Sequence, residues 1–165
     1  MMRASPFEQY SSYFENIANR HKKIKSFYEI DEDEIISGLR SKVQYPCLFL
    51  EFPEPTAFDN STNTDVKQPS GLAVLSPCKP GDFKKRREIL VENEKIILDI
   101  VSQMRKDRIE GNNLWFDLNQ TRWSKVGPMF TDNLYGWRLD FNIQRWLDIE
   151  YYESDWNEEE NEETP

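Results

Sequence analysis

The chain has 165 residues, of which 38% are hydrophobic and 13% aromatic, so it can fold as one domain without disulfides or a metal. A formal net charge of −9 argues against a basic surface that would bind nucleic-acid phosphates regardless of sequence. No apolar run approaches the roughly 20 residues of a membrane span, and residues 1–14 lack the apolar core of a signal peptide. We therefore expect a soluble protein in a reducing compartment, with Cys47 and Cys78 as buried free thiols.

The N-terminal segment predicts a helix over about residues 5–25. Ser5 can cap this helix, Pro6 suits its first turn, and Glu8 can complete a capping box. A narrow stripe of mostly apolar side chains then recurs every three or four positions: Phe7, Tyr10, Phe14, Ile17, His21 and Ile24. Such a stripe can pack on the chain's own sheet or on a neighbouring subunit, so its first three members are candidate interface residues.

The next segment predicts a short helix, two strands and a long loop. Acidic residues 31–34 precede the short helix, and we interpret them as helix caps because the spacing of a calcium-binding loop is absent. Residues 47–52 form a continuous apolar run, which predicts a strand buried on both faces. Residues 53–70 contain three prolines and show no periodicity, so we expect a long loop there. Residues 71–76 predict a second strand that could pair with the first as a hairpin.

Residues 82–107 predict the main helix of the chain. Asp82 can cap it, and apolar side chains recur along it with helical spacing: Leu90, Ile97, Val101 and Met104. Its first turns hold four consecutive cations, which we name the basic turn: Lys84, Lys85, Arg86 and Arg87. The basic turn could bind a phosphate or an acidic neighbour, or it could be a solvated turn partly paired with Glu88 and Glu92.

The last third of the chain predicts an antiparallel meander. Strands are expected over 114–118, around 123–126 and over 135–143, where apolar and polar side chains alternate. Residues 146–151 could extend the last strand. The sheet would be mostly antiparallel, with four or five strands.

Three tryptophans and an acidic C-terminus are candidates for contacts with partners. Trp115 and Trp123 occupy those alternating positions of their segments that hold fewer apolar side chains, so their rings are expected on the exposed face. Tryptophan is favoured at interface hot spots. Residues 153–165 are acidic and nearly without aliphatic side chains, so we expect a disordered tail. Trp156 within this tail is typical of a short docking peptide.

No residue pattern predicts a catalytic, cofactor or metal site, and we expect that the chain is not an enzyme. His21 is the one histidine, it lies on the stripe of the first helix, and the sequence shows no partner that would orient it as a general base. The two cysteines stand alone and the six glycines are scattered, so neither a zinc site nor a phosphate-binding loop is expected. An enzyme whose carboxylates meet only in the fold stays an open alternative, with Asp117, Asp132 and Asp140 as its candidates.

These elements together predict an α+β domain over residues 1–152. It would have an N-terminal helix over about 5–25 and a core over about 45–150, in which one long helix packs on the sheet. The acidic tail 153–165 would follow the domain.

The element order and the segment Trp123–Ile143 resemble the tail terminator, or tail completion, proteins of tailed phages and contractile injection systems. In that segment Asp132-Asn133-Leu134 and Gly136 lead into an amphipathic final strand. The resemblance covers about residues 45–150, and it leaves the N-terminal helix and the acidic tail without a family counterpart.

This resemblance implies a structural protein of the virion that assembles in the host cytoplasm and makes no membrane contact. Copies, commonly six, would form a ring between the tail tube and the head connector, and DNA would pass through the lumen without specific binding. A ring requires that one patch meet a different patch on the next subunit. The candidates for these patches are the aromatic stripe of Phe7, Tyr10 and Phe14, the loop 54–69, and the basic turn, which would face acidic residues of a neighbour.

An alternative from the charge balance is an acidic inhibitor or adaptor that binds a host protein, for example a nuclease, by mimicking DNA. Residues 153–163 hold seven of the 30 acidic side chains, and removing them brings the formal net charge from −9 to about −2. The folded part is therefore nearly neutral, which weakens the mimicry hypothesis.

Overall fold

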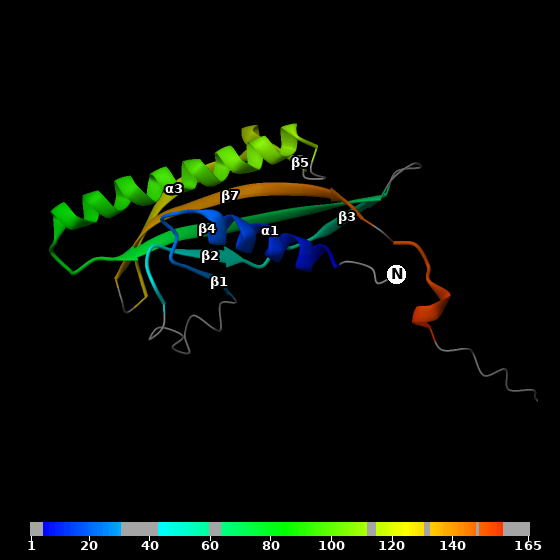
Figure 1. Ribbon diagram of the computed structural model, residues 1–165, viewed down its shortest axis with the longest axis horizontal. Coiled ribbons are helices and arrows are strands. Elements are labelled where there is room, and N and C mark those ends of the chain that lie inside the picture. The colour runs from blue at the N-terminus through cyan, green and yellow to red at the C-terminus, as the bar shows by residue number, and fades with distance from the viewer. Residues whose placement is uncertain are drawn as a thin grey trace, which may run out of the picture.

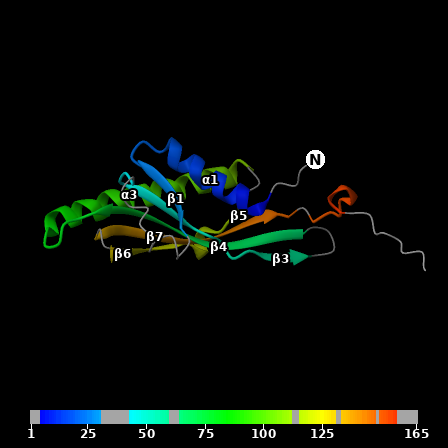
Figure 2. The same ribbon diagram turned by 90° about the horizontal axis from the view of Figure 1, so that it is seen from below.

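A computed structural model describes residues 5–30, 43–59, 64–111, 115–130, 133–147 and 149–156. Within these residues the chain is α+β, with two α-helices and a mixed seven-stranded sheet. Both helices lie on the same face of the sheet, which gives a two-layer architecture (Figures 1 and 2). The short helix expected after residues 31–34 lies outside the described residues.

Helix α1 (Pro6–Arg20) begins as the sequence predicts but ends earlier. Ser5 and Glu8 form the expected capping box. His21 is the C-cap with an extended backbone, and strand β1 (Ser26–Ile30) begins five residues later. The expected helix to residue 25 is therefore too long. Apolar side chains keep helical spacing as far as Ile24, but residues 26–30 pair with Cys47–Glu51 as a strand. This tertiary pairing prevails over the local helix propensity.

The sheet is built around two long antiparallel strands, β4 (Thr64–Pro77) and β7 (Leu134–Trp146). Strand β2 (Cys47–Glu51) and strand β3 (Thr56–Asp59) both pair with β4, and β1 adds to β2 in parallel. On the other side β5 (Trp115–Phe116) and β6 (Arg122–Met129) both pair with β7. The sheet thus has seven strands among the described residues rather than four or five, because short strands share the long edges of β4 and β7.

The expected loop 53–70 is wrong in its described part, because these residues include β3 and the first half of β4. In the first half of β4, Val66 and Gln68 point to the same face of the sheet and are buried. The sequence did not reveal this strand, because the polar Gln68 and then Pro69 interrupt the alternation of apolar side chains. Pro69 lies opposite Asn142 of β7, which shows that the ladder passes straight through the proline. The predicted strand 71–76 is the second half of a longer strand.

Helix α3 (Phe83–Ile109) confirms the predicted main helix, with Asp82 as its N-cap. The main core lies between α1, α3 and one sheet face, and its largest fully buried side chains include Tyr10, Phe14, Ile96, Ile97, Ile100 and Met104. Two tyrosines of α1 also form polar contacts: the Tyr10 hydroxyl donates to the Glu51 carbonyl at 2.9 Å, and the Tyr13 hydroxyl to Asp107 Oδ2 at 2.8 Å. Helix α1 is therefore part of the chain's own core.

The last segments depart from the predicted meander in detail. Strand β5 is only two residues long, because the Asp117 side chain accepts a hydrogen bond from the Asn119 amide and starts the 3-10 helix η2 (Leu118–Gln120). Strand β7 ends at Trp146, and no strand follows in residues 149–152. At the start of the expected tail, Glu153–Asp155 form a short 3-10 helix, η3, and residues 157–165 lie outside the described residues.

No described helix covers the opposite face of the sheet. Because strand side chains alternate, this face receives Ala73 and Leu75 of β4 and Arg138 of β7, whereas Leu72 and Val74 point into the main core. A small apolar cluster forms there around Leu75 and Leu134.

Candidate interaction surface

The basic turn forms the exposed beginning of α3. The Asp82 side chain accepts a hydrogen bond from the Lys85 amide at 2.9 Å and so fixes the first turn. Lys85 Nζ lies 3.6 Å from Glu88, whereas Lys84 and Arg87 form no ion pair with any described residue. The positive end of the helix dipole adds to their charge. This end of the helix therefore presents two cations that are open to an acidic partner.

Arg86 differs from the other three members of the basic turn. Its guanidinium lies 4.9 Å from the centre of the Phe83 ring and 4.7 Å from that of Tyr135, so it packs between two aromatic rings. Its Nε atom is buried and has no hydrogen-bond partner among the described residues. Phe83 is itself 72% exposed, which places an uncovered aromatic ring beside the cations. Arg86 therefore joins the helix to β7, and its three neighbours face outward.

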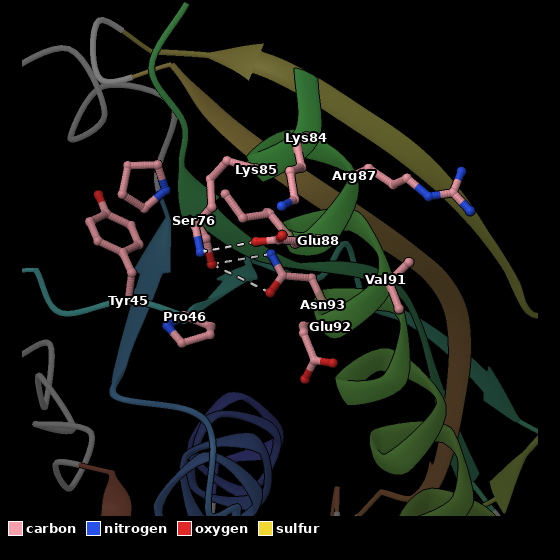
Figure 3. A pocket seen from close by; sticks show the side chains of 12 residues that line it. Tyr45, Pro46, Ser76, Lys84, Lys85, Arg87, Glu88, Val91, Glu92 and Asn93 are labelled. Atoms are coloured by element: carbon pink, nitrogen blue, oxygen red, sulfur yellow. Dashed lines mark hydrogen bonds and ion pairs between the residues drawn. The ribbon is translucent and has the colours of Figure 1, made fainter. Parts of the chain in front are cut away.

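A groove of about 850 Å³ runs along this end of α3. Figure 3 shows Tyr45 and Pro46 across the groove from the first turns of the helix, with Ser76 and Asn93 between them. Its lining combines apolar walls with cations, and includes Tyr45, Pro46, Pro77, Ile89, Lys84 and Arg87. Such a surface fits a ligand that carries both apolar and acidic groups.

Asn93 fixes the floor of the groove. Its side chain is buried, and Nδ2 donates to the Val74 and Tyr135 carbonyls at 3.3 Å each, so it ties α3 to both long strands. Gly136 makes this close approach possible. A Cβ on Gly136 would lie 1.9 Å from the Val74 carbonyl oxygen and 3.0 Å from Asn93 Nδ2. The floor of the groove is therefore held by hydrogen bonds to both long strands.

Only the first member of the aromatic stripe remains available to a partner. Tyr10 and Phe14 are 0% exposed because they fill the core beneath α1, so they are wrong as interface candidates in the folded chain. Phe7 is 40% exposed and packs edge-on against Phe52, with ring centres 5.3 Å apart.

The three tryptophan candidates are exposed, but they lie apart. Trp115 stacks beneath the Arg108 guanidinium at 4.2 Å near the end of α3. Trp123 donates its indole N–H to Glu94 at 3.1 Å beside the middle of α3. Trp156 follows η3 and stacks on Tyr151, with ring centres 5.6 Å apart. The structure therefore does not combine them into one site.

Segment 149–156 and the basic turn lie at opposite ends of the molecule (Figure 1). Arg86 contacts Tyr135 at the start of β7, and segment 149–156 follows the other end of that strand. A strand of 13 residues spans roughly 40 Å. The cationic and the acidic surfaces are thus separated by the length of the sheet.

The open sheet face carries a second polar cluster. Arg138 Nε and Nη2 donate to the two carboxylate oxygens of Glu51 at 2.8 Å each, and Arg138 also pairs with Asp140. These hydrogen bonds raise the pKa of Arg138. A groove of about 600 Å³ lies beside the cluster, and Phe52, Leu75 and Phe130 are among its lining residues.

The described side chains that were considered for catalysis each form a contact within the fold. His21 Nε2 lies 3.2 Å from Asp99 Oδ2, a contact across 78 positions that the sequence did not reveal. Asp117 caps η2, Asp140 binds Arg138, and Asp132 lies outside the described residues. Burial raises the pKa of the Cys47 thiol to about 12. Cys47 and Cys78 are both buried and form no disulfide, as expected.

Two further observations concern classes of function. In the part of the chain that the structure describes, no group of three or more His, Cys, Asp or Glu side chains could hold a metal ion. Neither described helix is long and apolar enough to cross a membrane.

No protein-family model matches the chain, and no curated protein sequence matches it.

Proposed function

We propose that the chain is a structural assembly protein whose copies join head to tail into a ring, and that it has no catalytic role. The observation that carries this proposal is the separation of two unlike surfaces, because the cationic turn and groove lie at one end and the acidic, aromatic segment at the other. A contact between unlike patches repeats from copy to copy and closes into a ring when its rotation allows.

We further propose that this ring is of the tail terminator type. The resemblance of the element order and of Trp123–Ile143 to those proteins supports this assignment. On this proposal about six copies stack between the tail tube and the head connector of a virion, after assembly in the host cytoplasm. DNA passes through the lumen without specific binding, and the net charge of −9 is compatible with this, since it disfavours sequence-independent contacts with phosphates.

Native mass spectrometry and negative-stain electron microscopy of the purified full chain test this function. We expect a closed ring of about six copies at micromolar concentration, and density for the same ring at the end of isolated tails. A chain that stays monomeric at all concentrations and never joins a tail contradicts the proposal.

The charges on α3 favour assembly over DNA mimicry. A mimic needs unpaired carboxylates spread over its folded surface, whereas Glu92 is bound by Lys23 at 2.7 Å and by Lys95 at 3.0 Å. Glu94 accepts the hydrogen bond from Trp123. We therefore place the inhibitor or adaptor role second, and capture of a basic nuclease by the full chain would reverse this order.

A further inference from the structure

The groove beside α3 has a surplus of positive charge once its internal pairs are counted. Two of its lining residues are acidic, Glu88 and Glu92. Glu88 pairs with Lys85, and hydrogen bonds from Lys23 and Lys95 lower the pKa of Glu92 to about 2, so this carboxylate stays ionised and paired at neutral pH. The charges of Lys84 and Arg87 are not matched within the described residues. An occupant of this groove should therefore be acidic.

The walls of the groove also call for apolar groups. Tyr45, Pro46 and Pro77 line it. The exposed ring of Phe83 lies nearby, at the first residue of α3. Aromatic side chains pack well on proline and aromatic surfaces and lose little entropy when they are fixed. The occupant should combine carboxylates with at least one aromatic ring.

The C-terminal segment of this chain has that composition. Residues 153–165 carry seven acidic side chains and no basic one. Tyr151 is 71% exposed and Trp156 is 65% exposed, so neither ring is covered by the domain that precedes it. A stacked pair of uncovered aromatic rings next to an acidic run is a surface that lacks its partner.

The segment cannot reach the groove of its own copy. Helix η3, drawn in orange-red, lies beyond the far end of the sheet from the start of α3 (Figure 1), and β7 alone spans roughly 40 Å. The acidic residues 158–163 follow Trp156 by at most seven positions, which span at most about 25 Å. The contact is therefore possible only between two copies.

We infer that residues 149–165 of one copy dock in the groove between α3 and Tyr45-Pro46 of the next copy. This inference rests on the proposed ring and names the contact that would close it. In this contact, acidic side chains of the segment pair with Lys84 and with Arg87, whose side chain extends from the side of α3 away from Tyr45 and Pro46 (Figure 3), and the rings of Tyr151 and Trp156 pack on the apolar wall. The contact is directional, because each copy offers one segment and one groove.

The direct test measures self-association of the full chain by light scattering and sedimentation at low and high salt. Deletion of residues 157–165 and the double variant Lys84→Glu/Arg87→Glu should each weaken self-association at least tenfold, and high salt should weaken that of the full chain. Arg105→Glu/Lys106→Glu is the matched control, since it makes the same charge change at the other end of the same helix. Circular dichroism verifies that every variant is folded.

A charge exchange between copies makes the test specific. Glu158→Lys/Glu159→Lys/Glu160→Lys/Glu162→Lys/Glu163→Lys changes the formal charge of residues 153–165 from −7 to +3 and should also prevent self-association. An equimolar mixture of this variant with Lys84→Glu/Arg87→Glu should assemble, because each segment then meets a groove of opposite charge. Failure of the mixture to assemble, while both variants are folded, overturns the inference.

The outcomes separate this inference from the proposed function. If the chain without residues 157–165 forms rings as the full chain does, the docking is wrong and the ring stands. If the full chain associates through its segment into open oligomers that never close, the docking stands and the ring is wrong. A full chain that is monomeric at every concentration overturns both.

Discussion

Glu51 of β2 and Arg138 of β7 pair through two hydrogen bonds of 2.8 Å although strand β4 lies between their strands. Gly71 of β4 makes this bridge possible. A Cβ on Gly71 would lie 2.6 Å from Glu51 Oε2 and 2.7 Å from Arg138 Nη2. The glycine thus leaves a gap on the open sheet face that the ion pair fills.

The first prediction follows from that gap. Gly71→Ala should displace the ion pair and lower the free energy of unfolding by about 1 kcal/mol, the upper range for a half-exposed pair. Urea denaturation measures it. In a Glu51→Gln/Arg138→Met background the same substitution should cost much less, because no bridge is left to displace. Equal costs in the two backgrounds would show that Gly71 does not act through this pair.

The second prediction compares a buried and a partly exposed aromatic side chain of α1. Phe14→Ala should lower the free energy of unfolding by about 3–5 kcal/mol, because Phe14 is fully buried beneath the helix. Phe7→Ala, on the same helix, should cost less than about 1 kcal/mol, since Phe7 is partly exposed at the edge beside Phe52. Denaturation of both variants under identical conditions checks this order, and a larger loss for Phe7→Ala would contradict the assignment of Phe14 to the core.

The third prediction concerns alkaline stability. Burial raises the pKa of Cys47 to about 12 and raises the pKa values of Tyr10 and Tyr13 as well. A group whose pKa is raised in the folded state stabilises the fold fully below its unfolded pKa, and this stability is lost as pH rises toward the folded pKa. The free energy of unfolding should therefore fall above about pH 8.5, where an unfolded cysteine begins to ionise.

Cys47→Ala isolates the thiol in this effect. Between about pH 8 and 9 an unfolded cysteine ionises while unfolded tyrosines, whose pKa is about 10, stay mostly protonated, so the variant should have a flatter stability curve there. Denaturation curves at half-unit steps of pH provide the measurement. A curve parallel to that of the native sequence would assign the loss to other groups.

The fourth prediction tests the charge balance of the groove. Hydrogen bonds from Lys23 and Lys95 lower the pKa of Glu92 to about 2, so its contribution to stability is present above about pH 4.3 and is lost as pH falls toward 2. Carbon-detected NMR of the Glu92 carboxyl should show this low titration. Lys23→Met/Lys95→Met should move the midpoint back toward 4.3, and an unchanged midpoint would rule out these two lysines as its cause.

Contacts between near neighbours in the chain were predictable from the sequence. The capping box of Ser5 and Glu8, the Asp82 cap and the alternation in β7 each depend on residues within a few positions. Their interactions form wherever the chain folds, so the starts of α1 and α3 were predicted correctly.

Strands that depend on distant partners were not predictable. Residues 26–30 are half-buried throughout and become a strand because they pair with Cys47–Glu51, some 20 residues away. The β3–β4 arm was hidden by Gln68 and Pro69, which look like loop residues until β7 lies beside them. Tertiary pairing decided both elements.

The candidate surface divides in the same way. The sequence by itself determined the run of cations from Lys84 to Arg87 and the acidic run after Glu153, because charge is a property of the residues alone. Only the tertiary structure placed Arg86 between two aromatic rings and set Tyr45 across a groove from the helix. It also placed the cations and the described acidic residues 150–155 at opposite ends of the sheet, because β7 runs the length of the domain between them.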